Sequence, residues 1–185
     1  MNIFILDRNP IDAARYHCDS HVVKMIMESG QMLSAAHHVH DGRVAVNRVR
    51  GLLRLTHANH PCTIWVRTAM WHYQWTHQLM GGLLHQYTLR YGKLHAYEDL
   101  WEALRLQPFN LPMYTPSGLS MSVPPQCMPD PYKVESQGEN DWDAVVTAYR
   151  NYYFFAKLHI AEWKYPAVEP AWYTQMLNEH TRESQ

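Results

Sequence analysis

The sequence predicts an all-α protein with a single domain over residues 1–185, built of three main helices, shorter helices and long proline-rich loops. Three stretches, 19–40, 61–91 and 140–163, repeat apolar residues at helical spacing. The length, with 46% hydrophobic and 18% charged residues, is typical of one globular domain with a substantial core.

The first part of the chain predicts an extended segment and two helices. Residues 2–6 are apolar and β-prone, which indicates a short extended segment or the lead-in to the core, and residues 11–17 predict a short helix after a turn. The first long helix covers 19–40, and either Asp19 or Ser20 can cap its start.

The second long helix begins at the sequence Asn59-His60-Pro61. Proline suits the first helical position, where its missing N–H is not needed, and Asn59 or His60 can cap the helix. We expect one helix over 61–91 with an aromatic stripe in the core. A glycine pair at 81–82 indicates a kink or a close helix crossing.

The last part of the chain predicts two helices around a long loop. Residues 97–106 favour a shorter helix, and the proline-rich stretch 107–138 predicts an irregular connection that is either functional or mobile. The last long helix covers 140–163, and we expect a polar tail after residue 173.

Charge and composition argue against several classes of protein. The net charge of −1 argues against general electrostatic attachment to duplex DNA, although the basic stretch 43–58 is either a solvated segment or a phosphate contact. No run of eighteen apolar residues occurs and the first seven residues do not resemble a signal peptide, so we expect no membrane segment. Three scattered cysteines predict a reducing, cytoplasmic location without a disulfide framework.

Four polar side chains share one face of the first long helix. At steps of three, four and three residues they are His21, Lys24, Glu28 and Gln31. Spacing alone favours an ordinary surface ion pair between Lys24 and Glu28. The other interpretation is an active site with Glu28 as its carboxylate.

The remaining signals for a site are weaker. His60 stands at a helix start, where free N–H groups attract anions, although a capping histidine is the simpler interpretation. Histidines at 17, 21, 37, 38 and 40 show no HExxH motif or zinc spacing, so we expect no metal and no cofactor. No GxSxG motif occurs, and Cys62 has no evident base.

Four motifs follow one another along most of the chain. They are His21 and Glu28 on the first long helix, Asn59-His60-Pro61, Pro129-Asp130-Pro131-Tyr132, and Pro170-Ala171-Trp172-Tyr173. Their order resembles the pyrimidine-dimer DNA glycosylase family, the phage endonuclease V type and its bacterial relatives. The chain looks like a divergent phage branch, with insertions after the N-terminus and around 97–125. For a phage protein, the expected location is the host cytoplasm.

The resemblance implies cleavage of the N-glycosidic bond of a damaged pyrimidine in DNA, then strand nicking through a Schiff base. It assigns the catalytic carboxylate to Glu28 and supporting histidines to His21 and His60, and Lys24 is a candidate to orient Glu28 or to replace the amine nucleophile. The expected substrate or DNA contacts are Asn59, Gln31, Arg67, Tyr132, Lys133, Trp172 and Tyr173.

The chain departs from the family at the nucleophile and at two arginines. The phage enzyme uses the α-amine of a small residue exposed by removal of Met, whereas position 2 here is Asn, and Met27 and Gln31 replace the arginines. Two alternatives therefore stay open. One is an enzyme acting on a free nucleotide, nucleoside or modified base with the same pocket, and the other is a non-catalytic helical module that binds nucleic acid or protein.

Overall fold

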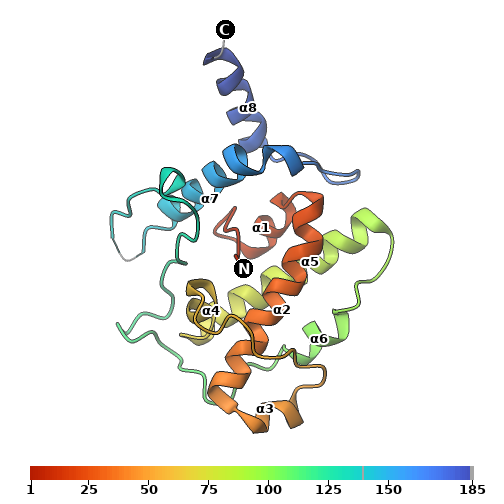
Figure 1. Ribbon diagram of the computed structural model, residues 1–185, viewed down its shortest axis with the longest axis vertical. Helices are drawn as coiled ribbons and strands as arrows, with labels where there is room; N and C mark the ends of the chain where they lie inside the picture. The colour runs from red at the N-terminus through yellow and green to blue at the C-terminus, as the bar shows by residue number, and fades with distance from the viewer. Residues whose placement is uncertain (139, 184–185) are drawn as a thin grey trace.

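The computed structural model describes residues 1–138 and 140–183, which contain eight α-helices and no strand (Figure 1). The all-α prediction is therefore confirmed for this part of the chain. The helices are α1 (Pro10–Tyr16), α2 (Asp19–Asp41), α3 (Arg43–Arg48), α4 (Pro61–Val66), α5 (Met70–Tyr91), α6 (Glu98–Ala103), α7 (Trp142–Lys157) and α8 (Ala171–Glu183). Two 3₁₀ turns cover Asp130–Tyr132 and Leu158–Ile160.

Helices α2 and α5 form the centre of the molecule, and α1 packs against α5 while α4 packs against α2. In Figure 1 the helix α8 projects from the end of the molecule opposite α3. The N-terminal segment 3–6 is not a strand but is fully buried in the core. It lies between α2 and α7, because the Phe4 ring contacts His21 on one side and Tyr153 on the other.

Phe4 holds an unusual backbone conformation in this segment. Its φ is +52°, a region that non-glycine residues rarely adopt, and its carbonyl accepts a hydrogen bond from the Leu6 N–H at 2.9 Å. Arg150 of α7 donates to the Leu6 carbonyl at 2.9 Å. Packing and hydrogen bonds from α2 and α7 therefore hold the turn in place against its local preference.

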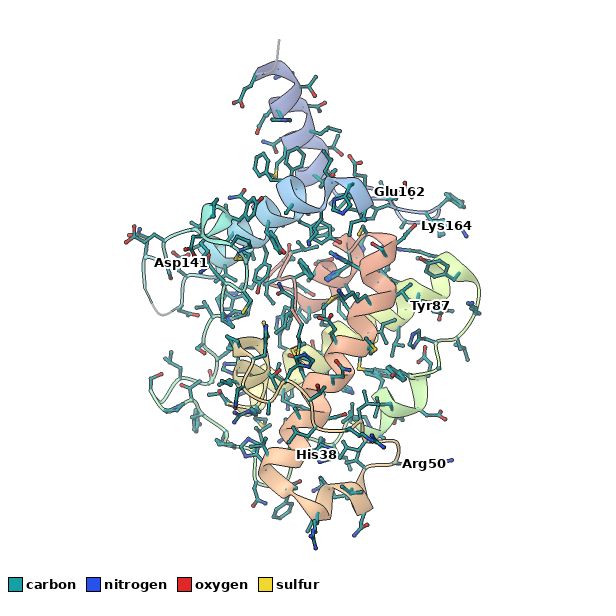
Figure 2. All side chains as sticks on the ribbon, in the orientation of Figure 1. His38, Arg50, Tyr87, Asp141, Glu162 and Lys164 are labelled. Atoms are coloured by element: carbon teal, nitrogen blue, oxygen red, sulfur yellow. The ribbon has the colours of Figure 1, made fainter. Side chains whose placement is uncertain are left out.

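The start of α2 differs from the prediction. Cys18 is the N-cap residue and makes no side-chain cap hydrogen bond, so neither Asp19 nor Ser20 caps the helix. The Asp19 N–H donates to the Glu162 carbonyl at 2.9 Å, and the Asp19 carboxylate accepts from the Lys164 N–H at 3.0 Å. Figure 2 shows Glu162 and Lys164 at this end of α2. The aspartate joins two distant segments instead of capping its own helix.

The single helix expected over 61–91 is wrong, because the chain breaks into α4 and α5. Ala69 is extended, with φ −151° and ψ 156°, and the Met70 N–H donates to the Pro112 carbonyl at 2.8 Å. The buried His72 Nδ1–H donates to the Trp65 carbonyl at 2.8 Å. These long-range partners satisfy backbone groups that a helix end leaves free, so the break is well compensated.

The C-terminal part also ends differently from the prediction. Helix α7 stops at Lys157, ahead of the expected end near residue 163, and α8 replaces the expected polar tail. Only Tyr173 of α8 is buried, although Trp172, Tyr173, Met176 and Leu177 recur at the spacing of an amphipathic helix.

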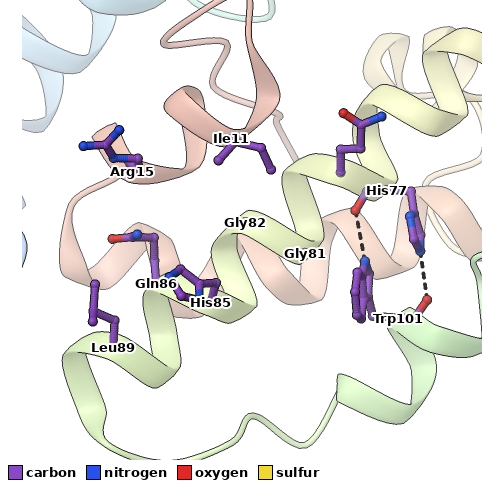
Figure 3. A pocket seen from close by; sticks show the side chains of 10 residues that line it. Ile11, Arg15, His77, Gly81, Gly82, His85, Gln86, Leu89 and Trp101 are labelled. Carbon is purple, nitrogen blue, oxygen red and sulfur yellow. Dashed lines mark hydrogen bonds between the residues drawn. The ribbon is translucent and has the colours of Figure 1, made fainter.

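The glycine pair of α5 marks a close helix crossing. A Cβ on Gly82 would lie 2.7 Å from the Cβ of Ala14 in α1, and a Cβ on Gly81 would lie 2.9 Å from the Trp101 ring of α6. Figure 3 shows both glycines on α5, where this helix passes α1 and the Trp101 side chain. The absence of side chains lets the three helices approach one another.

We expect Gly82→Ala to destabilise the protein by about 1–2 kcal/mol. Overpacking a tight contact costs about 1–3 kcal/mol, and the better helix propensity of alanine returns at most about 1 kcal/mol. Urea unfolding followed by circular dichroism measures the change. In an Ala14→Gly background the same substitution should be neutral or stabilising, and an equal loss in both backgrounds would contradict the crossing as its cause.

Candidate active site around Glu28

The Glu28 carboxylate lies on α2 with its side chain 8% exposed. The Asn2 N–H donates to Glu28 Oε2 at 2.7 Å, and the α-amine of Met1 lies 3.8 Å from the same oxygen. Lys24 Nζ lies 3.7 Å from Oε1, although its own side chain is 62% exposed. The carboxylate therefore faces one cationic group at each oxygen, and it is no part of a solvated helix face.

The Asn2 side chain shapes the N-terminal turn that reaches Glu28. Its Oδ1 accepts from the Ile3 N–H at 2.8 Å, and its Nδ2 donates to the Cys127 carbonyl at 2.8 Å. Thr63 Oγ1 donates to the Met1 sulfur at 3.0 Å, and the Met1 side chain is 1% exposed. Contacts from α2, α4 and the loop before the first 3₁₀ turn thus fix the α-amine.

His21 lies on the same helix, two turns before Glu28, and is buried. Its ring stacks on Phe4 with centroids 4.5 Å apart and meets the Tyr153 ring edge-on at 5.1 Å. Burial lowers the pKa of His21 to about 3, and His17 and Lys157 add to the effect. His21 is therefore neutral near pH 7 and is no cationic proton donor there. Its buried Nδ1 has no hydrogen-bond partner among the described residues.

His60 caps α4, as the sequence suggests. Its Nδ1 accepts from the Cys62 N–H at 3.2 Å. Burial lowers the pKa of His60, the positive α-amine and His57 lower it further, and Glu28 opposes them. His60, the α-amine and Glu28 therefore share one electrostatic neighbourhood.

Tyr132 belongs to a row of rings that reaches His21. The Tyr132 and Tyr152 centroids are 5.3 Å apart, and Tyr152 stacks on Phe4 at 5.9 Å. Phe4 in turn stacks on His21. The loop residue therefore lies in the same aromatic cluster as the helix histidine, although it comes from the opposite half of the chain.

Three other expected contacts lie on different elements: at the start of α4, on α2, and at the end of the first 3₁₀ turn. Asn59 is exposed next to the capping histidine, and Gln31 is half-buried on α2. Lys133 pairs with Asp130 at 2.7 Å. Arg67 has a structural contact, because it donates to the Ala58 carbonyl at 3.5 Å.

The aromatic pair of α8 packs inside the molecule. Tyr173 is 2% exposed, and the Trp172 ring lies beneath the Arg150 guanidinium, 5.2 Å from its centroid. Trp172 also meets Tyr16 and Tyr153 edge-on at 6.4 Å. Both side chains hold α8 against α1 and α7, and Trp172 stays half-buried whereas Tyr173 is enclosed.

A separate cavity of about 520 Å³ lies between α1, α5 and α6 (Figure 3). Its floor is the glycine pair of α5, and its walls include Ile11, His85, Leu89 and Trp101. All predicted site residues are described, and none of them lines this cavity. The cavity is therefore separate from the candidate site around Glu28.

The burial of His21 predicts that acid destabilises the protein. The unfolded chain binds a proton at this residue below its ordinary pKa of 6.5, whereas the folded protein does not until the pH nears 3. The contribution of His21 to the free energy of unfolding is therefore fully present above pH 6.5 and is lost as the pH falls toward 3. The loss is about 1 kcal/mol per pH unit. We expect His21→Phe to reduce the pH dependence of the urea unfolding free energy by this amount between pH 6 and 5.

The exposed His159 provides the control for this measurement. His159→Gln should keep the wild-type slope of stability against pH. Equal slopes in wild type and His21→Phe would show that His21 is not held neutral by the fold. The comparison uses slopes, so a general loss of stability in either variant does not affect it.

No described helix has the length and apolar character needed to cross a membrane. Comparison of the chain with protein-family models, curated proteins and solved structures finds no match.

Proposed function

We propose that this protein is an N-glycosidase that acts on a damaged or modified pyrimidine base in DNA. One observation carries the proposal: a buried carboxylate, Glu28, lies 3.8 Å from an α-amine and accepts a hydrogen bond from the next backbone N–H. The four motifs that resemble pyrimidine-dimer DNA glycosylases support the same function, because they assign the catalytic carboxylate to this position.

In the proposed reaction the target nucleotide leaves the base stack and its sugar approaches Glu28. The α-amine, after it loses a proton to solvent, attacks C1′ of the sugar and the bond from C1′ to the base breaks. The base leaves with the electron pair of that bond and takes up the proton that the attached nitrogen then releases. The carboxylate stabilises the positive charge that develops on the sugar, as carboxylates do in glycoside cleavage. The resulting amine–sugar adduct opens to a Schiff base, which permits strand nicking.

The identity of the amine depends on whether Met1 is retained. With Met1 present, its α-amine is the nucleophile at 3.8 Å from Glu28. With Met1 removed, the nitrogen of Asn2, 2.7 Å from Glu28, becomes the amine. The exposed Lys24 is the remaining candidate. The neutral His60 contributes hydrogen bonding to substrate and no positive charge.

Borohydride trapping tests the proposal. Protein mixed with DNA that carries ultraviolet-induced pyrimidine dimers should give a covalent adduct after reduction, and mass spectrometry should locate it on the N-terminal peptide. An adduct on Lys24 would assign the nucleophile to that residue. Dimer-containing DNA that gives neither an adduct nor abasic sites and strand breaks would contradict the glycosidase with an amine nucleophile.

A second candidate is an enzyme that acts on a free nucleotide, nucleoside or modified base. The net charge of −1, and the presence of Met27 and Gln31 beside Glu28, favour it because they leave few cationic groups for a DNA backbone. Binding measured at several salt concentrations separates the two. Tight binding of DNA that weakens steeply with salt supports the first, and release of base from a free nucleotide without DNA binding supports the second.

A further inference from the structure

Three side chains that bind soft metal ions converge beside the N-terminal turn. One ligand atom each of His60, Cys62 and Cys127 lies within 4.8 Å of the other two. His60 and Cys62 come from the start of α4, and Cys127 comes from the loop before the first 3₁₀ turn. The spacing along the sequence fits no metal motif, which is why sequence analysis predicts no metal site.

The separations suit a tetrahedral ion with little movement. Zinc bonds of about 2.3 Å to sulfur and about 2.0 Å to nitrogen place neighbouring ligand atoms roughly 3.5–3.8 Å apart. The three atoms here are within about 1 Å of that arrangement. Two thiols and an imidazole form a donor set that prefers Zn²⁺ to Mg²⁺ or Ca²⁺.

Both thiols are held in place by the surrounding backbone. Cys62 is buried in the first turn of α4, while the Cys127 N–H donates to Tyr149 Oη at 3.3 Å and the Cys127 carbonyl holds Asn2. A hydrogen bond between the thiols lowers the pKa of Cys127 and raises that of Cys62. Binding of the ion requires both thiols to lose their protons, and the positive charge of the ion favours that loss.

His60 exchanges one interaction for another when it binds the ion. Its Nδ1 accepts the cap hydrogen bond from the Cys62 N–H at 3.2 Å, so metal binding through the ring removes this bond. The loss of one long cap hydrogen bond is small beside the binding free energy of a thiolate site. Three protein ligands leave a fourth position for water or for the neighbouring α-amine, which already influences the pKa of all three residues.

We propose that His60, Cys62 and Cys127 form a binding site for a thiophilic divalent metal ion, with Zn²⁺ as the expected ion. This proposal does not rest on the proposed glycosidase activity, because metal binding requires only the three side chains and an open fourth position, but His60 belongs to both sites. A bound ion would connect α4 to the long loop and would lie beside the turn that carries Asn2 to Glu28.

Titration of the reduced protein with Co²⁺ tests this site by its absorption spectrum. We expect one Co²⁺ per chain, thiolate-to-cobalt charge-transfer bands in the near ultraviolet, and intense visible bands of a tetrahedral ion that Zn²⁺ abolishes. Cys62→Ser and Cys127→Ser should each reduce the charge-transfer absorption and weaken binding at least about 10-fold, as even indirect changes around a metal do. His60→Gln should shift the visible bands.

Cys18 supplies the matched control, because it is a buried cysteine at the start of α2 whose thiol contacts Ser20. Cys18→Ser should leave the Co²⁺ spectrum unchanged. If Cys62→Ser fails to fold, the half-buried loop residue Cys127 still decides the test. Weak octahedral Co²⁺ bands, a spectrum that survives both serine substitutions, or a Cys62–Cys127 disulfide in a protein that binds no Co²⁺ when reduced would each overturn the proposal.

Discussion

Glu28→Gln is expected to reduce cleavage of the N-glycosidic bond in dimer-containing DNA by about 10²–10⁴-fold, the range in which a positioned acid–base group contributes. The substitution removes the negative charge that stabilises the developing cation on the sugar, and it ends the attraction to the α-amine and Lys24. The fold should persist, because the new amide oxygen can still accept from the Asn2 N–H. Single-turnover formation of abasic sites and strand breaks measures the effect, and urea unfolding checks the fold.

Asp99→Asn is the matched control for this experiment. Asp99 is an exposed acid on α6, and its substitution also removes one negative charge. Its activity should equal that of wild type within twofold. A Glu28→Gln protein that is folded and fully active would exclude Glu28 as the catalytic carboxylate.

Arg90→Ala is expected to destabilise the protein by about 3–5 kcal/mol, the usual loss when one partner of a buried ion pair is removed. The guanidinium is 0% exposed and lies 3.0 Å from the Asp19 carboxylate. It also donates to the carbonyls of Arg15 and His17 and to the Gln86 side chain. Because these acceptors belong to α1, α2 and α5, the substitution leaves several of them without a donor.

Arg105→Ala tests whether the effect comes from burial. Its guanidinium pairs with Glu102 at 3.2 Å, but both side chains are more than 60% exposed. The loss should therefore be at most about 1 kcal/mol. Urea unfolding of both variants gives the comparison, and similar losses for the two arginines would contradict the role given to the buried network.

Some helix ends could be predicted, because they depend on residues next to them. Gly42 and Gly92 end α2 and α5 with φ of +56° and +67°, conformations that glycine adopts without strain. Asp141 caps α7 by accepting from the Ala144 N–H at 3.0 Å. The composition of a few adjacent residues determines such ends, so a sequence pattern can find them.

The break between α4 and α5 could not be predicted, because its partners are distant along the chain. The Met70 N–H is satisfied by Pro112, and the buried His72 receives the Ser122 N–H at 2.9 Å. The proline-rich loop thus forms hydrogen bonds that a continuous helix would have made internally. Apolar periodicity carries no information about such a replacement.

In the candidate site, too, the contacts between neighbouring residues of one helix could be predicted, whereas the contacts between distant parts of the chain could not. The helical spacing placed His21, Lys24 and Glu28 on one strip, and the structure shows that two of these side chains are buried while Lys24 is exposed. The groups that bind Glu28 come from the N-terminal turn, 26 residues away for Asn2. Cys127, which holds Asn2, lies 125 residues away. The apolar run that follows Asn2 was the only signal that the N-terminus enters the core.

The buried N-terminal turn determines how this protein can be produced for study. The Met1 side chain is 1% exposed and contacts Thr63, and the α-amine lies beside Glu28. Residues added before Met1 would need a path from this enclosed position to the surface. They would also convert the α-amine into a peptide nitrogen and remove its charge. Helix α8, in contrast, projects away from the rest of the molecule (Figure 1). An affinity tag or fluorescent label therefore belongs after α8, and a label before Met1 would alter the chemistry under study.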